Sequence, residues 1–392
     1  MGAVSIMTSQ IGSLAFSRLS RHFADSKVPF EVIMPSGESH KFGKGQPSFT
    51  VTLKNRRAIK ALVSLDEGNV GEAFLDGSIE ITGDMLRPFE LRGTLSDAHP
   101  LTTIWRFLQP LVLGQVSTNR RAIADHYDID ADFFLSFLDP EIPMYTQGVY
   151  VQESESLAAA TRRKFDWCIE QCRLKSGDRV LEIGPGWGGF AEYAFKRGIH
   201  LTGITISSYS RDFLNKLKER TGGDWDIQLV DFLEYQPKAE FDAIVIMGVI
   251  EHIPDYKAVL ERFSRWVKPG GRIFLDGSAA TKKYELSSFM VRHIYGGNHS
   301  FLVLHDFLDK LASTPLKLVE CYNDRDSYFY TFRQWAINFD ANRDKVVARF
   351  GEFNFRRFQL YLWGAAYEFF SGSLDCYRMI IERPIYGDGR SA

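Results

Sequence analysis

The sequence of 392 residues predicts an α/β protein with a doubly wound parallel sheet and a smaller α+β domain in front of it. Three observations lead to this prediction. A glycine-rich loop follows a short apolar run at residues 180–189, and strand-like segments alternate with helix-like segments from there to residue 278. The sheet and its helices do not require the first part of the chain, so a unit of about 120 residues precedes them.

The loop VLEIGPGWGG (180–189) indicates both a local geometry and a ligand class. Its apolar residues are typical of a strand, and Gly184, Gly186 and Gly188 allow a tight turn that lies flat against a ligand. The spacing ExGxGxG, with Glu182 as the acid, is that of S-adenosylmethionine (SAM) methyltransferases and not the GxGxxG of dinucleotide-binding proteins. It predicts a Rossmann-like class I SAM methyltransferase; a turn without a ligand is the alternative for this loop taken alone.

The segments after the loop support the first interpretation. We expect strands at 200–206, 226–231, 242–250 and 271–278, and helices at 188–198, 208–221 and 254–268. The strand at 242–250 is nearly all apolar, as is typical of a strand buried on both faces. Ligands of such sheets bind at the carboxyl ends of the strands, where polar and glycine residues should converge. These are residues 184–189, 205–207, Asp231, Glu251 and Asp276.

Composition limits the function classes. A net charge of −2 and a pI near 6.5 produce no field that attracts nucleic acid. No apolar run reaches transmembrane length and no signal peptide is evident, so we expect a cytoplasmic protein. Four cysteines fit a reducing compartment without disulfides. Cys168 and Cys172 lie four residues apart on an expected helix, but without further ligands they indicate core packing, and we predict no metal site.

Aromatic residues make up 14% of the sequence and concentrate at 133–137, 328–332 and 353–370. Aromatic rings can pack a core, face a cation or line an apolar tunnel. Core packing explains any single ring equally well, but the collective excess after the sheet favours a large apolar ligand.

Motifs along nearly the whole chain resemble those of the cyclopropane fatty acid synthases, a family that includes the mycolic acid cyclopropane synthases. The segment AIADHYDIDADFFLSFLDPEIPMYTQGVY (122–150) is similar to the family's HYD..NDFY..FLD....YSCGY motif, and GEAFLDGSIEITGD (71–84) to part of its N-terminal domain. Five later segments follow in the family's order: GITIS (203–207), MGVIEHIP (247–254), KPGGRIFLDG (268–277), SYFYTFRQWAINF (327–339) and RRFQLYLWGAAYEFF (356–370).

The resemblance implies a set of SAM contacts. Tyr145 and Thr146 match the Tyr and Ser that close over SAM, and Thr205 matches the Thr after the second strand. Ser210 replaces a Gln of the family, which leaves ribose recognition open. Asp231 could accept the adenine amino group or cap a helix. The expected cofactor residues are Tyr145, Thr146, Glu182, Gly184, Gly186, Gly188, Thr205, Ser207, Ser210, Asp231 and Phe232.

The resemblance also implies methyl transfer from SAM to the double bond of an unsaturated fatty acyl chain on a phospholipid. The resulting carbocation requires a site that excludes water and a base that removes a proton. In the family, a bicarbonate held by Cys, Glu, His, Ile and Tyr is the base. Glu251 and Tyr328 match that Glu and Tyr, but Gln147, Asp276 and Ser278 replace the Cys, His and Ile.

These replacements make bicarbonate doubtful, because two carboxylates in one pocket should repel it. Either Asp276 is the base, or no ring forms and the cation gives a methylene group, which a separate reductase could convert to a methyl branch. The predicted catalytic residues are Glu251, Tyr328, Asp276 and Gln147, each with a structural alternative as helix-terminal acid, core residue or buried hydrogen-bonding group. His252 is a further candidate, and His126 and Tyr127 could shape the mouth of the acyl site.

We expect residues 1–120 to form a lipid-handling or membrane-contact domain and residues 121–392 the catalytic domain. The segment LAFSRLSRHFA (14–24) could rest on a bilayer or pack against the catalytic domain. The expected location is the cytoplasm, peripherally at the inner face of the membrane. A reductase and a second copy of the chain are candidate partners, and nucleic acid is not.

Two other function classes stay open from the sequence alone. One is SAM-dependent C-methylation of a soluble natural product, which a polar pocket near Tyr328 would favour. The other is a noncatalytic SAM-binding or lipid-binding module, against which the intact glycine loop and Glu251 argue.

Overall fold

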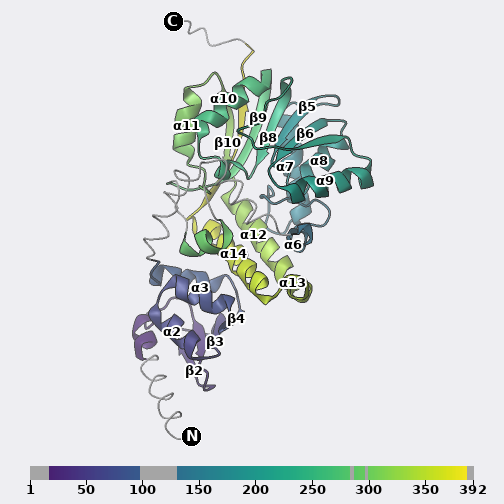
Figure 1. The fold of residues 1–392 in the computed structure, drawn as a ribbon. Coiled ribbons are helices and arrows are strands. Elements are labelled where there is room, and N and C mark those ends of the chain that lie inside the picture. The colour runs from purple at the N-terminus through teal and green to yellow at the C-terminus, as the bar shows by residue number, and fades with distance from the viewer. Residues whose placement is uncertain (1–16, 98–129, 283–286, 296–298, 386–392) are drawn as a thin grey trace. The chain divides into compact units, whose positions relative to one another are not determined.

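The computed structural model describes residues 17–97, 130–282, 287–295 and 299–385. Its internal contacts divide the chain into two compact units (Figure 1). The first unit comprises Met1–Pro100, Ser287–Phe289 and Asp344–Tyr367, and the second comprises Leu101–Leu286, Met290–Arg343 and Glu368–Ala392. The domain boundary expected near residue 120 lies outside the described residues, as do His126 and Tyr127.

The first unit contains a four-stranded sheet in the order β2-β1-β3-β4. Its strands are β1 (Phe30–Ile33), β2 (Ser39–Phe42), β3 (Phe49–Leu53) and β4 (Ile79–Gly83), of which only β1 and β3 pair in parallel. Alternate residues of β1 and β3 are buried, and stacked rings of Phe30, Phe42 and Phe49 fill part of the core. The expected α+β character of this unit is confirmed.

Helices α2 (Arg56–Ser64) and α3 (Glu67–Leu75) connect β3 with β4, and a 3₁₀ helix, η1 (Arg87–Thr94), follows. Asn55 and Asp66 cap the two α-helices by accepting backbone N–H groups at 3.0 and 2.9 Å. Helices α13 (Arg343–Phe350) and α14 (Glu352–Ser371) return to this unit for most of their length. Arg356 of α14 donates to the carbonyls of Phe74 and Ile79, so a segment that the sequence analysis placed in the catalytic domain packs here instead.

The second unit contains a seven-stranded sheet in the order β10-β11-β9-β8-β5-β6-β7. The strands are β5 (Arg179–Ile183), β6 (His200–Thr205), β7 (Trp225–Leu229), β8 (Phe241–Met247), β9 (Val267–Ala279), β10 (Lys317–Asn323) and β11 (Asp375–Glu382). Strands β5 to β9 are parallel, as expected. The sheet as a whole is mixed, because a strand that the sequence did not predict, β11, pairs antiparallel with both β9 and β10.

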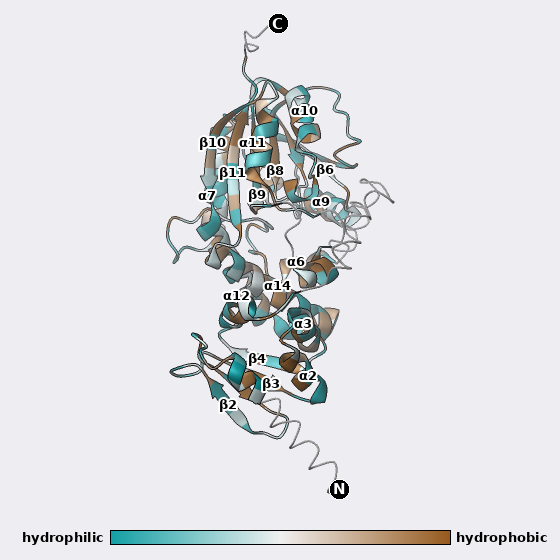
Figure 2. Cartoon of the chain, turned by 90° about the vertical axis from the view of Figure 1, so that its left-hand side faces the viewer, coloured by the Kyte–Doolittle hydropathy of each residue, from teal (hydrophilic) through white to brown (hydrophobic). Residues whose placement is uncertain are grey.

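Successive residues of the central strands face opposite sides of this sheet and build two hydrophobic cores. On one side, Ile244 and Ile246 pack with α10 (Tyr256–Trp266) and α11 (Leu304–Ala312). On the other, Ala243 and Val245 pack with α7 (Leu157–Gln171), α8 (Gly189–Phe195) and α9 (Ser208–Thr221). Figure 1 shows these helices on the two faces of the sheet, and Figure 2 shows much of the sheet between them as hydrophobic. The doubly wound arrangement is confirmed.

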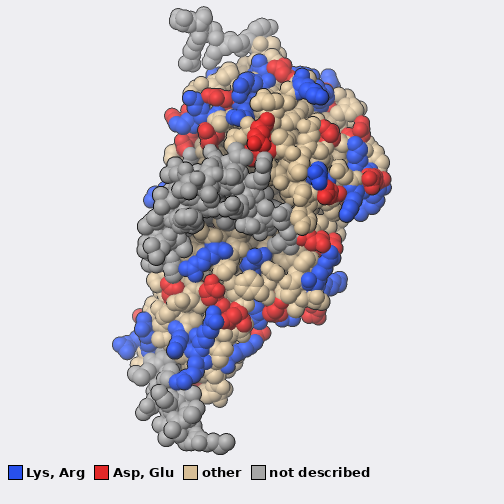
Figure 3. Space-filling view, in the orientation of Figure 1, with Lys and Arg blue, Asp and Glu red and all other residues tan. Residues whose placement is uncertain are grey.

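Among its described residues, the second unit also contains α6 (Ala131–Leu135), α12 (Arg325–Ala341), the 3₁₀ helix η2 (Ile250–His252) and the π-helix η3 (Met290–Ile294). Within the described ranges, no helix has both the length and the hydrophobicity needed to cross a bilayer. Basic and acidic side chains are interspersed over the described residues of the face in Figure 3.

Candidate functional site

The glycine-rich loop begins where β5 ends at Ile183 and leads into α8. Gly184 and Gly188 have φ angles of +72° and +81°, in the left-handed region that favours glycine. A Cβ atom on Gly184 would stand 2.5 Å from Val249 Cγ2, so the close approach of the loop to the end of β8 also requires glycine. In contrast, no heavy atom lies within 4 Å of the place where a Cβ of Gly186 would be. The loop therefore leaves open space beside Gly186.

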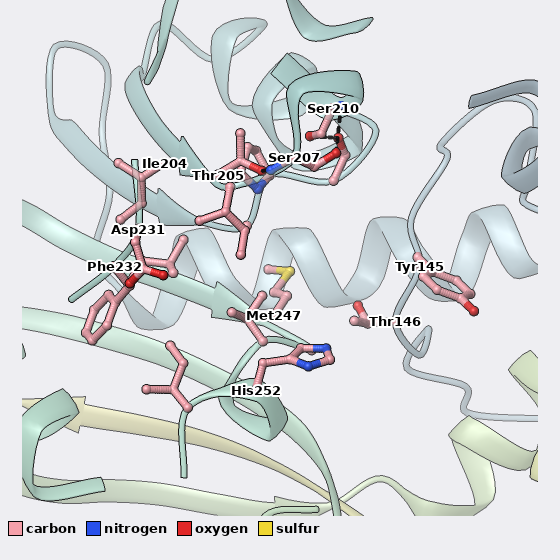
Figure 4. Close-up of a pocket in the computed structure, with 18 of the residues that line it drawn as sticks. Tyr145, Thr146, Ile204, Thr205, Ser207, Ser210, Asp231, Phe232, Met247 and His252 are labelled. Carbon is pink, nitrogen blue, oxygen red and sulfur yellow. Dashed lines mark hydrogen bonds between the residues drawn. The ribbon is translucent and has the colours of Figure 1, made fainter. Parts of the chain in front are cut away.

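A cavity of about 150 Å³ lies at this edge of the sheet. The glycine loop, the ends of β6 and β8, the segment after β7 and residues 144–146 line it (Figure 4). In Figure 4, Asp231 and Phe232 lie on one side of the cavity and Tyr145 on the other, with Met247 and His252 between them. Nine of the predicted cofactor residues are in its wall: Tyr145, Thr146, Gly184, Gly186, Thr205, Ser207, Ser210, Asp231 and Phe232.

The other two predicted cofactor residues, Glu182 and Gly188, lie behind this wall. Glu182 is buried in β5, and its Oε2 atom has no hydrogen-bond partner among the described residues. Burial raises the pKa of Glu182 to about 8. A Cβ atom on Gly188 would stand 2.6 Å from Leu214 Cδ2, so this glycine lets the loop pack closely on α9.

Hydrogen bonds fix several polar side chains of the cavity wall. Ser210 Oγ donates to the carbonyl of Gly186 at 2.7 Å and ties α9 to the glycine loop. Ser207 caps α9 by accepting the Ser210 N–H at 3.2 Å. Asp231 Oδ1 accepts the N–H of Leu233 at 2.8 Å, so Asp231 closes a turn while it also lines the cavity. The two roles that the sequence left open for Asp231 are therefore compatible.

A buried ion pair lies behind Thr146 and Gly248 of the cavity wall. Lys164 on α7 and Asp276 on β9 are both 0% exposed, and Lys164 Nζ lies 3.2 Å from Asp276 Oδ2. Lys164 Nζ also donates to Thr146 Oγ1 at 2.5 Å, and the Gly248 N–H donates to Asp276 Oδ1 at 3.0 Å. Burial raises the pKa of Asp276, and the Lys164 ammonium opposes this effect. Both carboxylate oxygens of Asp276 are thus bonded within the protein.

Glu251, in η2, is buried and has one bonded and one unbonded carboxylate oxygen. Its Oε1 accepts the N–H of Ser278 at 2.7 Å, whereas Oε2 has no hydrogen-bond partner among the residues that the structure describes. Burial raises the pKa of Glu251 to about 7, and the charge of Asp276 acts in the same direction. Glu251 can therefore take up or release a proton near neutral pH.

A series of aromatic rings connects the cavity with Tyr328 on α12. The ring centroids of Tyr145 and Trp335 are 5.3 Å apart, those of Trp335 and Tyr328 are 6.3 Å apart, and Tyr328 stacks on Phe369 at 4.5 Å. Burial raises the pKa of Tyr328 well above its usual value, so its phenol stays neutral. Aromatic rings thus pack against Tyr328, and the charges of Glu251 and Asp276 also raise the pKa of its phenol.

Gln147 belongs to a second buried group of polar side chains. Its Nε2 donates to Asp324 Oδ2 at 3.4 Å, and Arg378 Nε on β11 donates to the same oxygen at 2.7 Å. Gln147 Oε1 has no hydrogen-bond partner within the described part of the chain. Gln147 is therefore held by a carboxylate that the sequence analysis did not consider.

Most of the buried ionisable groups described above lie near Cys376 on β11. Burial raises the pKa of its thiol well above the usual value, and the charges of Asp276, Asp324 and Glu251 act in the same direction. Cys376 and Glu251 likewise raise the pKa of the Tyr328 phenol. The structure therefore brings three predicted catalytic residues together around a cysteine that was not predicted.

His252, the residue after Glu251, lines the cavity itself. Its ring centroid is 5.0 Å from that of His299, which stacks on Tyr295 at 3.9 Å. Burial lowers the pKa of His252 to about 4, so the imidazole is neutral at physiological pH. A neutral ring does not repel a cationic ligand in the cavity.

Sequence reasoning missed Lys164, although the sequence carried a signal for it. Leu157, Lys164 and Cys168 recur at helical spacing on the buried face of α7, and a lysine on such a face requires a buried partner. Cys376 and Arg378 were missed because the strand that carries them was not predicted.

Comparisons with known proteins agree with this geometry. Residues 115–379 match the family model described as mycolic acid cyclopropane synthetase, and residues 18–90 match a domain family of unknown function. A probable fatty acid methyltransferase of Pseudomonas putida is 26% identical over 379 residues, which cover 92% of this chain and 93% of that protein. A sphingolipid C9-methyltransferase of Candida albicans is 26% identical over 336 residues, or 80% of this chain, but the match spans only 65% of that protein.

Among solved structures, mycolic acid cyclopropane synthase CmaA1, complexed with SAH and CTAB, superimposes with a TM-score of 0.62. It is 21% identical in sequence, and the match covers 67% of this chain and 97% of that protein. The seven-stranded sheet and the cavity at its carboxyl edge define a class I SAM methyltransferase fold. The family model covers most of the second unit, and the chain belongs to the mycolic acid cyclopropane synthetase family. The predicted fold class and family are confirmed.

The residues present do not fit bicarbonate, the anion that the family resemblance implies. Both buried cations of this region are already paired, Lys164 with Asp276 and Arg378 with Asp324. An added anion would meet the carboxylates of Asp276 and Glu251 without an unpaired cation among the described residues of the region. We therefore derive no step through bicarbonate.

Proposed function

We propose that this protein transfers the methyl group of SAM to the double bond of an unsaturated fatty acyl chain. The observation that carries the proposal is Glu251, a buried carboxyl group with an unbonded oxygen next to a residue of the cavity wall. The names of the two relatives, a fatty acid and a sphingolipid methyltransferase, support an acyl lipid as the substrate.

The cavity suits SAM in its chemistry. Gly186 leaves room for a ligand to lie against the loop. Phe232 offers an apolar surface to the adenine ring of SAM, and the neighbouring Asp231 offers a carboxylate to the adenine amino group. Thr205 and Thr146 add hydroxyl groups for the polar parts of the cofactor. When bound, SAM supplies an electrophilic methyl group.

The protein must also protect the product of the first step. An alkene is a weak nucleophile, and its methylation leaves a carbocation that water would capture. The rings of Tyr145, Trp335 and Tyr328 form a surface that excludes water, and their π electrons stabilise the positive charge of the carbocation. Because burial keeps the phenol of Tyr328 protonated, Tyr328 supplies no anion that would trap the cation.

Glu251 accepts the proton that the cation must lose. Its ionised Oε2 takes a proton from the transferred methyl group, and the electron pair of that C–H bond closes a cyclopropane ring on the cationic carbon. After a hydride shift, the same proton loss forms a C=CH₂ group instead. A pKa of about 7 suits a base at neutral pH. Asp276 and Gln147 act as positioning residues, since their partners are Lys164 and Asp324.

The ring and the methylene group are two outcomes of this one mechanism. A methyl branch would require a separate reductase that adds hydrogen to the methylene product. We place the acyl chain on a membrane phospholipid and the protein peripherally at the inner face of the membrane. Exposed Arg56 and Lys60 on α2 of the first unit would meet anionic head groups there.

Incubation with vesicles of a monounsaturated phospholipid and methyl-labelled SAM tests the proposal. We expect label in the acyl chains and a mass gain of one CH₂, with loss of the double bond for a ring and retained unsaturation for a methylene group. Glu251→Gln should still bind S-adenosylhomocysteine (SAH) but lose activity by at least about 100-fold. Unlabelled acyl chains from wild-type protein that binds SAH would refute the proposed function.

A further inference from the structure

Lys164 has an unusual environment for a lysine. Its side chain is completely buried in α7, where its ammonium contacts the Asp276 carboxylate and the Thr146 hydroxyl. A buried ammonium costs folding free energy unless it is paired, and replacement of such a pair by apolar residues is often tolerated. Stability alone therefore does not explain why a lysine occupies this position.

The contacts of Lys164 form a closed loop that includes two residues of the cavity wall. Lys164 binds Asp276, Asp276 accepts the Gly248 N–H, and Thr146 accepts a hydrogen bond from Lys164. Gly248 and Thr146 also touch, because a Cβ atom on Gly248 would overlap with Thr146 Cγ2. Displacement of Lys164 would therefore release one stretch of the wall.

The chemistry of the ammonium decides what Thr146 can offer to a ligand. An ammonium has three donors and no acceptor, so Thr146 Oγ1 must accept the hydrogen bond from Lys164. The hydroxyl hydrogen of Thr146 is then left to donate elsewhere, and Thr146 lines the cavity. A hydroxyl fixed as a donor recognises an anionic group, and the anionic group of SAM is its carboxylate.

We propose that Lys164 is a positioning residue of the cofactor site, which orients the Thr146 hydroxyl as a hydrogen-bond donor to the carboxylate of SAM. Asp276 balances the charge of Lys164 and holds Gly248 in the adjoining wall. This inference rests on the proposed binding of SAM in the cavity. It adds an assignment for the carboxylate of the cofactor and explains both members of the buried pair.

A double-mutant cycle measured by calorimetric titration with SAH tests the inference. Thr146→Val should weaken SAH binding about tenfold in the wild-type background, because it removes a hydrogen bond to a charged group. The second background combines Lys164→Met with Asp276→Asn, which removes both charges but keeps an acceptor for the Gly248 N–H. In this background, Thr146→Val should weaken SAH binding by less than about twofold. An equal effect in both backgrounds would overturn the proposed role of Lys164.

The ligand 5′-methylthioadenosine, which lacks the carboxylate, separates this role from a general collapse of the cavity. Its affinity should stay unchanged in all these variants, and a parallel loss for both ligands would also overturn the inference. Lys268→Met, which removes a lysine paired with Asp242 away from the cavity, serves as the control. Failure of the wild-type protein to bind SAH would instead contradict the proposed function itself.

A second variant keeps the test open if the methionine variant does not fold. Lys164→Gln combined with Asp276→Asn retains an N–H donor for Thr146 without a buried charge. Its affinity for SAH should stay within about threefold of the wild-type value. A tenfold loss of SAH affinity in this variant, with normal binding of 5′-methylthioadenosine, would contradict the orientation of Thr146 by Lys164.

Discussion

Replacement of Glu251 by glutamine should stabilise the protein at alkaline pH while it removes the activity. In the folded protein the pKa of Glu251 lies at about 7, above its ordinary value of 4.5. A carboxyl group with a raised pKa favours the folded state at low pH, and this contribution is lost as the pH rises from 4.5 through 7. Glutamine has no such dependence, because it stays neutral throughout.

The size of the effect follows from the two pKa values. A rise from 4.5 to about 7 corresponds to about 3 kcal/mol of unfolding free energy between the fully protonated and fully ionised limits. Between pH 5 and pH 8, about 2.5 kcal/mol of this difference should develop. Glu251 is 4% exposed, so solvent screens little of it. Any constant cost of the new amide group cancels when the two pH values are compared.

Urea unfolding of both proteins, followed by tryptophan fluorescence, provides the measurement. The stability of the Glu251→Gln variant relative to wild type should increase by about 2.5 kcal/mol from pH 5 to pH 8. Glu240→Gln, at an exposed ion pair with Arg383, is the matched control and should show little change. A relative stability of the Glu251 variant that does not vary with pH would refute both the raised pKa and the role of this residue as a base near neutral pH.

Three further predictions concern the reaction and the cavity. The rate of methyl transfer should rise about tenfold from pH 6 to pH 8, because the ionised fraction of a base with a pKa of about 7 rises from about 9% to about 91%; a flat profile would exclude Glu251 as that base. Activity in carbonate-free buffer should equal that with added bicarbonate, since Lys164 and Arg378 are already paired, and dependence on bicarbonate would show that an anion enters the site. Gly186→Ala should abolish SAH binding but lower the unfolding free energy by only about 1–2 kcal/mol, because its Cβ would meet no protein atom while the backbone there is left-handed; unchanged SAH affinity would place the ligand elsewhere.

The parts of the fold that sequence patterns predicted are those specified by local geometry. The turn at Gly184 and the helix start at Ser207 depend on neighbouring residues, and the parallel strands follow from their apolar patterns. The expected strand at 271–278 begins earlier, at Val267, since Val267 pairs with Phe241 of β8. Strand β10 was not predicted because its side chains are largely exposed, and β11 because its partners are more than 50 residues away in the sequence.

In the candidate site, too, local sequence patterns predicted some residues, whereas others depend on contacts between distant parts of the chain. Residues at strand ends, such as Thr205 and Asp231, could be placed at the cavity from the strand pattern alone. The sequence could not show that Asp276 faces Lys164, because these residues are 112 positions apart and meet only in the folded sheet. From the sequence alone, Asp276 was therefore interpreted as a carboxylate without a cationic partner, and thus as a candidate base.

The position of β11 between β9 and β10 has a consequence for biosynthesis. The central part of the sheet is synthesised long before β11, yet β9 and β10 do not pair with each other and must both wait for it. Until the ribosome has released residues Asp375–Glu382, two strand edges lie open to water and to other nascent chains. A premature stop after α14 should therefore yield an aggregating polypeptide, even though every residue of the glycine loop would be present.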